Sequence, residues 1–463
     1  MGIKVLNNTG DARFIKMYRE LVNIILFVAN ETEYKVALNY LSKKSVVNFI
    51  YNDNSYHIGH IGEYLVAFVK SGDIGQESVS SCEPTLSRAL ETFFNAQYVI
   101  TAGVCGGVNP KTNIGDVIVA SEIINYESQK VDAKEIIDRS QALISQELTN
   151  LLSQTLSKMK FNKFAIKHGK VLSGAKLVSN KKFANQVLSI HPEAIALDME
   201  GYAVARFAIT HRMRDWIFIK AVSDYLYDKK GSANQAKSMR HSMMVLEKLL
   251  SMRDFLSTKK TKVLISGAFP TDLEETKDVE KFVYDLTQKL ITENFKVING
   301  YGQCVGNAVV AAAYNMQQRL GRLDKSLQDY IEIYPFPRIT NTQITKCLSL
   351  IKNENRRLMT KGCVFAIFIY GSKGENVLSE GMLEEFQLAQ QQGMFVIPIG
   401  FTGYMAKQLW NEVNGNINYY FPNDSAIISR FTCLDIEPDP HELIDATIEL
   451  IKSLTNYHCG INE

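Results

Sequence analysis

The chain alternates short apolar runs with longer amphipathic segments, and this alternation constrains its fold more than any other feature. The runs of the first half are rich in β-branched and aromatic residues and lie at residues 24–28, 65–69, 98–102 and 117–120. Strand-length runs separated by helix-length stretches are typical of an α/β sheet. We therefore expect an α/β fold.

A polar, basic stretch at residues 257–262 divides the sequence into two halves. It follows a long amphipathic segment, 234–255, and a new apolar run begins directly after it at residue 263. The chain has 463 residues, more than one hydrophobic core usually supports. We therefore expect two domains, residues 1–256 and residues 257–463.

The second half repeats the alternation in a Rossmann-like order. Its expected strands lie at residues 263–265, 295–298, 364–370 and 395–399, and its expected helices at residues 276–292, 306–320 and 381–392. The first 20 residues carry only a helical pattern that starts after Gly10, and we assign them no role.

Composition excludes several classes of function. Lys plus Arg (51) nearly balances Asp plus Glu (49), so there is no electrostatic reason to expect nucleic acid or an anionic membrane as a partner. The longest apolar stretches fall far short of the roughly 20 residues that span a bilayer. The seven cysteines show no CxxC pairing and no His partners at metal spacing. We expect a cytoplasmic protein with reduced thiols, no leader, no metal and no cofactor.

Three motifs in the first half follow expected strands, where open α/β sheets present polar groups to ligands. They are Ile100-Thr-Ala-Gly-Val-Cys-Gly-Gly-Val108, Ala196-Leu-Asp-Met-Glu-Gly201 and Ala221-Val-Ser-Asp224. In this order and spacing they resemble the nucleoside phosphorylase and nucleosidase superfamily, over about residues 22 to 250. The resemblance implies a phosphorylase-like mixed-sheet α/β domain that cleaves a purine–ribose bond.

The resemblance also implies roles for individual residues. Asp224 would be the general acid that protonates the purine's leaving nitrogen, and Ser223 would orient its carboxyl group. Glu200 would accept hydrogen bonds from the ribose hydroxyls, while Met199 packs on the sugar. Taken singly, an acidic residue after a strand is more often a helix cap than a catalyst. The joint occurrence of these residues favours the catalytic interpretation.

A nucleosidase also needs a base that activates water, and the resemblance places Glu33 in that role. Val104, Leu177 and Val178 match segments that contact the substrate. Related phosphorylases hold phosphate with an arginine and a serine, and this chain has Thr101 and Val104 at those places. Charge-assisted phosphate binding has therefore lost its usual donors. Hydrolysis is favoured over phosphorolysis.

The substrate is inferred from resemblance alone. Residues 55–76 look closest to phosphorylase-like domains fused to immune receptors and antiphage proteins, whose members cleave adenine nucleotides, including ATP. Lys176, His57 and His60 are candidates to meet the phosphates. A surface or packing role for each remains the alternative.

In the second half, the glycine-rich segment Asn299-Gly-Tyr-Gly-Gln-Cys-Val-Gly306 follows an expected strand and opens an expected helix. Such glycines let backbone N–H groups approach a phosphate at the helix N-terminus. The accompanying motifs are Leu264-Ile-Ser-Gly267, Tyr334-Pro-Phe-Pro337, Arg356-Arg-Leu-Met359, Ile369-Tyr-Gly-Ser-Lys373, Gly381-Met-Leu-Glu-Glu-Phe386 and Pro398-Ile-Gly-Phe-Thr-Gly403. The set resembles the SLOG sensor domain of Thoeris antiphage effectors, over about residues 261 to 410.

That family implies binding of a cyclic ADP-ribose isomer made by a TIR-domain partner, with reorganisation of a homo-oligomer that switches on the fused enzyme. By position, Arg356 would pair with a phosphate, and Glu385 or its neighbour Glu384 would hold a ribose. The residues that would line the pocket are Ser266, Gly267, Gly302 and Lys373. A SLOG-like domain that serves only assembly is the alternative.

Together the two halves predict a signal-gated effector that hydrolyses the N-glycosidic bond of adenine nucleotides or nucleosides. The main alternative is a constitutive purine nucleosidase or phosphorylase acting on adenosine or methylthioadenosine, with a structural C-terminal domain. A non-catalytic nucleotide sensor is a third possibility.

Overall fold

The computed structural model describes most of the chain. The described residues are 4–6, 11–42, 46–71, 82–131, 136–138, 140–176, 178, 180–226, 232–252, 255–319, 326–336, 348–374 and 377–457. In this part of the chain, no helix combines the length and the apolar character needed to cross a membrane. The chain forms two compact units: residues 1–10, 21–259 and 458–463 make up the first, and residues 11–20 and 260–457 make up the second.

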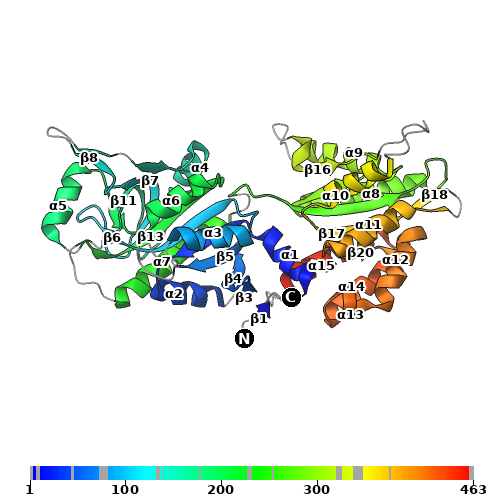
Figure 1. The fold of residues 1–463 in the computed structure, drawn as a ribbon, viewed down its shortest axis with the longest axis horizontal. Helices are drawn as coiled ribbons and strands as arrows, with labels where there is room; N and C mark the ends of the chain where they lie inside the picture. Colours follow the sequence, from blue (N-terminus) through cyan, green and yellow to red (C-terminus); the bar gives the residue numbers. More distant parts are fainter. Residues whose placement is uncertain are drawn as a thin grey trace. The chain divides into compact units, whose positions relative to one another are not determined.

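The first unit is built on one large mixed sheet (Figure 1). Its strand order is β1-β3-β4-β5-β2-β6-β12-β11-β7-β10, and β13 pairs with both β6 and β7. The strands are β1 (Lys4–Leu6), β2 (Ile24–Val28), β3 (Val46–Tyr51), β4 (Asn54–Ile61), β5 (Tyr64–Lys70), β6 (Tyr98–Gly107), β7 (Val117–Asn125), β10 (Gln141–Leu143), β11 (Ile166–Ser173), β12 (Ala196–Asp198) and β13 (Asp215–Tyr225). A separate hairpin pairs β8 (Gln129–Val131) with β9 (Ile136–Asp138).

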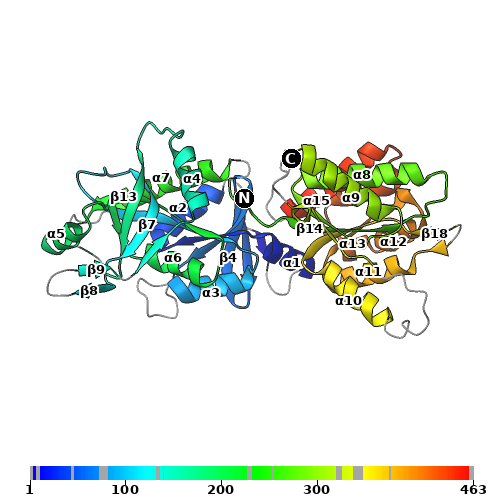
Figure 2. The same cartoon turned by 90° about the horizontal axis from the view of Figure 1, so that it is seen from above.

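Helices cover the central strands of this sheet and close the core. They are α2 (Glu31–Ser42), α3 (Cys82–Thr92), α4 (Gln146–Leu156), α5 (Lys181–Ile190), α6 (Gly201–Thr210) and α7 (Ser232–Leu250). Helix α2 packs on α7, and α3 packs on α6 on the opposite side of the sheet (Figure 2). All five residues of β2 and ten of the eleven residues of β13 are buried. Strands covered on both faces read as continuous apolar runs, as the sequence of this half does.

The second unit holds a parallel sheet with strand order β16-β15-β14-β17-β20. Its strands are β14 (Thr261–Ala268), β15 (Phe295–Asn299), β16 (Ile331–Ile333), β17 (Cys363–Tyr370) and β20 (Phe395–Pro398), and a small ladder pairs β18 (Ser372–Gly374) with β19 (Val377–Leu378). The chain order reverses between β14 and β17, which is where doubly wound sheets bind ligands. The Rossmann-like expectation for this half is confirmed.

The helices of the second unit lie on both faces of its sheet. They are α1 (Ala12–Leu21), α8 (Thr276–Thr292), α9 (Val305–Arg319), α10 (Leu348–Thr360), α11 (Glu380–Gln391), α12 (Tyr404–Gly415), α13 (Ile417–Tyr420), α14 (Ser425–Ile436) and α15 (Pro440–Asn456), with 3₁₀ turns at Leu327–Asp329 and Gly400–Thr402. Helix α8 packs on α9 and α15, whereas α10 packs on α11 (Figure 2).

Helix α1 comes from the start of the chain but belongs to the second unit. Its Phe14 ring lies 5.0 Å from Phe395 and 5.3 Å from Tyr457, and Lys16 donates to the carbonyl of Gln392 at 3.0 Å. Phe14 is almost fully buried. The helical pattern of the first 20 residues, which had no role in the sequence, thus completes the core of the second unit.

Most expected elements appear within a few residues of their expected ends. Three ends differ by five residues: β6 runs to Gly107 instead of Ala102, β7 runs to Asn125 instead of Ala120, and α7 ends at Leu250 instead of Phe255. Strand β6 continues because Gly103, Gly106 and Gly107 keep pairing with β13 as far as Tyr225. Glycines weaken a strand in isolation, but here they allow close approach of other side chains.

Candidate functional sites

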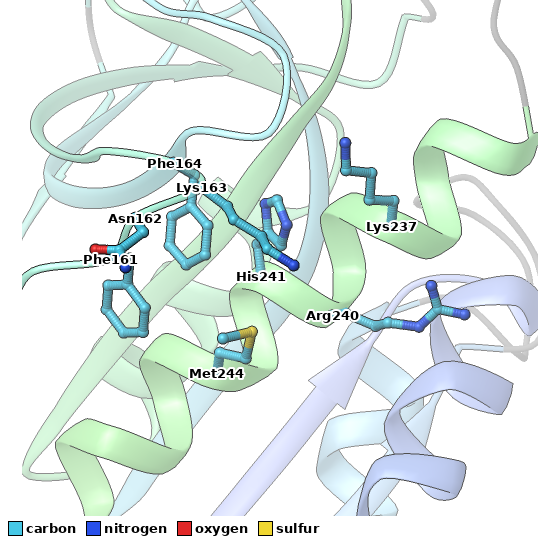
Figure 3. Close-up of a pocket in the computed structure, with 8 residues that line it drawn as sticks. All are labelled: Phe161, Asn162, Lys163, Phe164, Lys237, Arg240, His241 and Met244. Carbon is cyan, nitrogen blue, oxygen red and sulfur yellow. The ribbon is translucent and has the colours of Figure 1, made fainter.

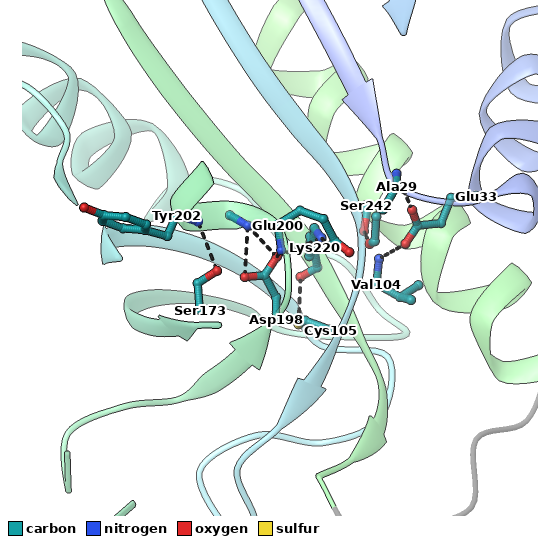
Figure 4. A network of polar contacts seen from close by, with 12 residues as sticks. Ala29, Glu33, Val104, Cys105, Ser173, Asp198, Glu200, Tyr202, Lys220 and Ser242 are labelled. Carbon is teal, nitrogen blue, oxygen red and sulfur yellow. Dashed lines mark hydrogen bonds and ion pairs between the residues drawn. The ribbon is translucent and has the colours of Figure 1, made fainter. Parts of the chain in front are cut away.

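Glu33 lies in the first turn of α2, directly after β2, and its carboxyl group is buried. Oε1 accepts a hydrogen bond from the backbone N–H of Val104 at 2.8 Å, and Oε2 accepts one from Ala29 at 2.9 Å (Figure 4). A methyl group at Gly103 would lie 2.6 Å from Oε1. The carboxyl is therefore fixed between the end of β2 and the second half of β6, and glycine is required beside it.

Lys220, in the middle of β13, is the centre of a charged network. Its Nζ lies 2.8 Å from Asp198 Oδ2 and 2.8 Å from Glu200 Oε2, and its side chain is 1% exposed (Figure 4). Asp198 also caps helix α6 by accepting the N–H of Gly201 at 2.9 Å. Because a buried ammonium needs hydrogen-bonded counter-charges, the network fixes the Glu200 carboxyl group.

The electrostatics of this network act on both Lys220 and Glu33. Burial raises the pKa of Glu33 and so does the charge of Glu200, while the ammonium of Lys220 opposes them. Burial would lower the pKa of Lys220, but Asp198, Glu200 and Glu33 together hold it well above its ordinary value. Lys220 therefore stays charged, and Glu33 is a stronger base than an exposed carboxylate.

Asp224 is the penultimate residue of β13 and is also buried, with 7% of its surface exposed. Ser223 donates its hydroxyl to Asp224 Oδ2 at 2.7 Å. A register shift between Val222 and Asp224 breaks the regular pairing with β6 at this point. The irregularity lets two consecutive residues, Ser223 and Asp224, act together rather than point to opposite faces of the sheet.

The structure places the other predicted residues of the first unit as follows. Val104 contributes its backbone N–H to Glu33, and Met199 is half-buried beside Glu200 in the chain. Val178 packs partly buried against a core cluster that includes Tyr126. Leu177 lies outside the described residues.

Two interacting residues were missed by sequence reasoning, Lys220 and Asp198. Lys220 interrupts the apolar run Trp216-Ile-Phe-Ile-Lys-Ala-Val222 of a strand that the sheet buries on both faces. A lysine at such a position is rarely buried unless it is paired. This interruption was a signal that could have identified a carboxylate partner elsewhere in the chain.

Two of the three candidate phosphate ligands have other partners, whereas the Nδ1 of the third, His60, is buried without a hydrogen-bond partner among the described residues. The Nδ1 of His57 makes a hydrogen bond with the Tyr34 hydroxyl. Burial lowers the pKa of His60 to about 4, so it is uncharged near neutral pH. Lys176 forms an exposed ion pair with Glu127 at 3.1 Å.

A pocket of about 420 Å³ lies elsewhere on the first unit (Figure 3). Its lining residues come from α7 and from the loop before β11: Phe161, Asn162, Lys163, Phe164, Lys237, Arg240, His241 and Met244. None of the predicted site residues lines it. The described part of the chain also holds no cluster of three or more His, Cys, Asp or Glu side chains that could hold a metal.

In the second unit, the candidate ligand residues gather at the carboxyl ends of β14 and β17. Ser266 donates its hydroxyl to Glu385 Oε2 at 2.6 Å, and Arg356 Nε lies 3.9 Å from Glu385 Oε1. Burial raises the pKa of Glu385 to about 6, and the nearby charge of Arg356 opposes that shift. Glu384 pairs with Arg356 as well, but 54% of its side chain is exposed.

Arg356 is 8% exposed, and its Nε has no hydrogen-bond partner among the described residues. Its guanidinium also lies 5.2 Å from the Phe336 ring. A buried donor left unsatisfied favours a ligand acceptor at this place. The arrangement combines a planar cation, an aromatic face and a carboxyl group, which suits a nucleotide.

The glycines predicted to line the pocket allow backbone segments to approach one another closely at the same edge of the sheet. A methyl group at Gly302 would lie 2.1 Å from the carbonyl oxygen of Gly267, and one at Gly267 would lie 2.6 Å from that of Ile369. No side chain fits at either position. Lys373 is exposed in the β18–β19 ladder.

Two family models match the sequence. Residues 23–252 match the phosphorylase superfamily, and residues 251–454 match the Sir2- and TIR-associating SLOG family. An NAD(+) hydrolase ThsA from Bacillus cereus is 31% identical over 207 residues, which are 42% of this chain and 41% of that protein.

Two further relatives carry nucleosidase names. A 5'-methylthioadenosine/S-adenosylhomocysteine nucleosidase from Maridesulfovibrio salexigens is 28% identical over 47% of this chain and 92% of its own length. A death domain-containing ATP nucleosidase from Amphimedon queenslandica is 26% identical over 45% of this chain and 44% of its own length.

The chain spans about two fifths of the length of the ThsA proteins that it matches. The two models nevertheless cover consecutive parts of the sequence and meet near residue 251, so each half has its own family. The chain therefore joins a domain of the phosphorylase superfamily to a domain of the Sir2- and TIR-associating SLOG family.

Proposed function

We propose that the first unit hydrolyses the N-glycosidic bond of adenine nucleotides or nucleosides. The observation that carries the proposal is the carboxyl of Glu33, held by two backbone N–H groups beside the Lys220–Glu200 ion pair. A fixed, buried carboxylate with a raised pKa suits a general base.

The geometry supports a division of labour between the carboxyl groups. Glu33 takes a proton from water as the water oxygen bonds to the anomeric carbon of the ribose. Asp224 gives a proton to the purine as the bond from that carbon to the ring nitrogen breaks. Glu200, fixed by Lys220, accepts hydrogen bonds from the ribose hydroxyls. The carboxyl groups also stabilise the positive charge that develops on the sugar.

Two residues favour water over phosphate as the nucleophile. Thr101 is 1% exposed, and its hydroxyl has no hydrogen-bond partner among the described residues, so it faces the protein interior. The N–H of Val104 already donates to Glu33. Phosphate binding relies on charged donors, whereas the Thr101 hydroxyl is neutral and buried and the Val104 N–H is already occupied. The observation favours a nucleosidase over a phosphorylase.

The substrate class rests on the named relatives. ATP and methylthioadenosine, which two of those names contain, are both adenine ribosides. An adenine-specific site that tolerates different 5' substituents accommodates both. We extend this specificity to the chain as part of the proposal.

We further propose that the second unit senses a cyclic ADP-ribose-type signal made by a TIR-domain protein, and that the protein is a cytoplasmic antiphage effector. The carrying observation is the buried Arg356 beside Glu385 and Phe336. Signal binding would favour one arrangement of a homo-oligomer in which the nucleosidase is active, which would deplete ATP.

Chromatography of purified protein incubated with ATP, AMP, adenosine or NAD(+) tests the enzyme, with and without cyclic ADP-ribose isomers and without phosphate. We expect release of free adenine only when signal is present, and none from Asp224→Asn. The matched control is Asp445→Asn, an exposed aspartate of α15 in the second unit. Adenine release that requires phosphate would contradict hydrolysis.

The second candidate is a constitutive nucleosidase acting on adenosine or methylthioadenosine. The hydrogen bond of His57, the ion pair of Lys176 and the low pKa of the buried His60 favour it, because these three residues then offer an incoming phosphate group little free positive charge. Signal-independent cleavage confined to uncharged nucleosides would establish this candidate and contradict the gated effector.

A further inference from the structure

Gln97, which immediately precedes β6, is bonded beside two of the four places where the chain passes between the units, those at residues 20–21 and 259–260. Its backbone N–H donates to the carbonyl of Asn23 at 2.8 Å, two residues after the end of α1. Its side-chain Oε1 accepts the N–H of Lys259, the last residue before the second unit begins. Two connections that are far apart in sequence therefore meet on one residue.

Gln97 also stands at the start of three parallel, adjacent strands. Its own carbonyl accepts the N–H of Arg214 at 2.7 Å, just before β13 begins. The strand registers pair Ile24 of β2 and Asp215 of β13 with the same residue of β6, Tyr98. Strands β2, β6 and β13 thus begin side by side at Gln97.

The far ends of these three strands hold the residues of the candidate active site. Strand β2 leads to Ala29, β6 leads to Val104, and both donate to the carboxyl of Glu33. Strand β13 leads to Asp224. At about 3.3 Å per residue, the distance from Gln97 to the Glu33 carboxyl along β6 is roughly 20 Å.

This three-strand path has the properties of a rigid connection. All five residues of β2 are buried, and β13 is buried over ten residues. A regular ladder joins β2 to β6, and the ladder between β13 and β6 is regular from Asp215 to Val222. Closely packed interiors resist compression and pass strain on rather than absorbing it. A change at the amino ends of these strands therefore displaces their carboxyl ends.

We propose that Gln97 is a positioning residue that ties two connections with the second unit, those at residues 20–21 and 259–260, to the strands that hold Glu33 and Asp224. The proposal rests on the roles proposed above for those two residues. It gives a covalent route by which the state of the second unit reaches the active site. No group at Gln97 touches the substrate.

Hydrogen–deuterium exchange of the full chain tests this route without any substrate or signal. Gln97→Ala removes the acceptor for Lys259 but keeps the backbone bond to Asn23. A separate Gly-Ser-Gly-Ser insertion between Lys259 and Lys260 keeps every contact of Gln97 but relaxes the connection. We expect each change to raise the exchange rate of the Ala29 and Val104 amides by about tenfold, the effect of one hydrogen bond.

The matched control is Gln154→Ala, which removes the same amide from the exposed face of α4 and leaves both rates unchanged. A purely local role for Gln97 would alter exchange at the amino ends of the strands only, and the insertion would alter nothing. Unchanged rates at Ala29 and Val104 in the insertion variant would overturn the proposal.

Steady-state kinetics with adenosine, in the presence of cyclic ADP-ribose, add a second readout. We expect Gln97→Ala to lower kcat and leave KM within twofold, because the residue acts on the position of Glu33 and not on binding. If cyclic ADP-ribose fails to change turnover of the unaltered protein, the proposed gating is wrong. The exchange rates decide the role of Gln97 independently of that result.

Discussion

Replacing Lys220 by methionine tests whether the buried charge network holds the first unit together. Methionine keeps most of the length of the side chain but removes the ammonium, which lies 2.8 Å from both Asp198 and Glu200 and is 1% exposed. Removing one partner of a buried ion pair costs about 3–5 kcal/mol, because the remaining charge has no counter-charge. In a domain of this size, that loss lowers the Tm by roughly 6–20 °C.

Differential scanning calorimetry of the full chain measures this effect directly. The matched control is Lys237→Met, an exposed lysine on α7, which we expect to change stability by less than about 0.5 kcal/mol. If Lys220→Met unfolded within about 2 °C of the unaltered protein, the network would contribute too little for the reasoning to hold.

The same substitution predicts a change in the pH dependence of turnover. The ammonium of Lys220 opposes the rise in the pKa of Glu33 that burial causes, so its removal raises that pKa further. A general base must be deprotonated, and activity is lost as pH falls through its pKa. The acid limb of the pH–rate profile should therefore move to higher pH in Lys220→Met. A limb that stays in place or moves to lower pH would contradict the role of Glu33.

Three further substitutions test both sites. Gly103→Ala places a methyl group 2.6 Å from Glu33 Oε1 and should lower kcat by about 100-fold, whereas Gly415→Ala, which meets nothing within 4 Å, should leave it unchanged. Glu385 has a pKa of about 6, so isothermal titration should show the affinity for cyclic ADP-ribose weakening as pH falls below that value, by at most about tenfold per pH unit. In Glu385→Gln this pH dependence should disappear. Arg356→Met should weaken binding by about 100-fold and, because the arginine lowers the pKa of Glu385, move the pH dependence to higher pH.

The sequence predicted those parts of the fold and of the candidate site that depend on a local pattern of residues. The buried strands of the first unit are continuous apolar runs, so β2 and the start of β6 could be located directly. The resemblance of the motifs to the nucleosidase superfamily then identified Glu33 and Asp224 as candidates. Ser223 and Asp224 are neighbours in the sequence, and the Ser223 hydroxyl donates to the Asp224 carboxyl group because the register of β13 shifts at this point.

Features that depend on contacts distant in sequence could not be predicted. Nothing near Lys220 in the sequence shows that Asp198 and Glu200, some twenty residues earlier, compensate its charge. Helix α1 has an amphipathic pattern, but only the structure shows that its apolar face, with Phe14, packs in the second unit. A periodic pattern identifies a helix without identifying the surface that it covers.

In the second unit the sequence left two neighbouring glutamates open as ligands. The helical geometry separates them, because consecutive residues on a helix point about 100° apart. Glu385 lies inward against Ser266, whereas Glu384 is more than half exposed and reaches Arg356 from the helix surface. The sequence could not distinguish them because the distinction depends on the rotation of α11 against β14.

The charge of the active site predicts how salt affects different substrates. Asp198, Glu200 and Glu33 outnumber the single ammonium of Lys220, which favours a cationic transition state but repels a triphosphate. Salt screens repulsion between a charged substrate and its site and leaves an uncharged nucleoside unaffected. The electrostatic screening length falls below about 10 Å as the salt concentration rises from about 20 to 200 mM. Over this range we expect the KM for ATP to fall and the KM for adenosine to stay constant. If the KM for ATP rises with salt instead, the net attraction between ATP and the site must come from cationic side chains near the bound phosphates. The carboxyl groups would then not determine the electrostatic potential at the site where a nucleotide binds.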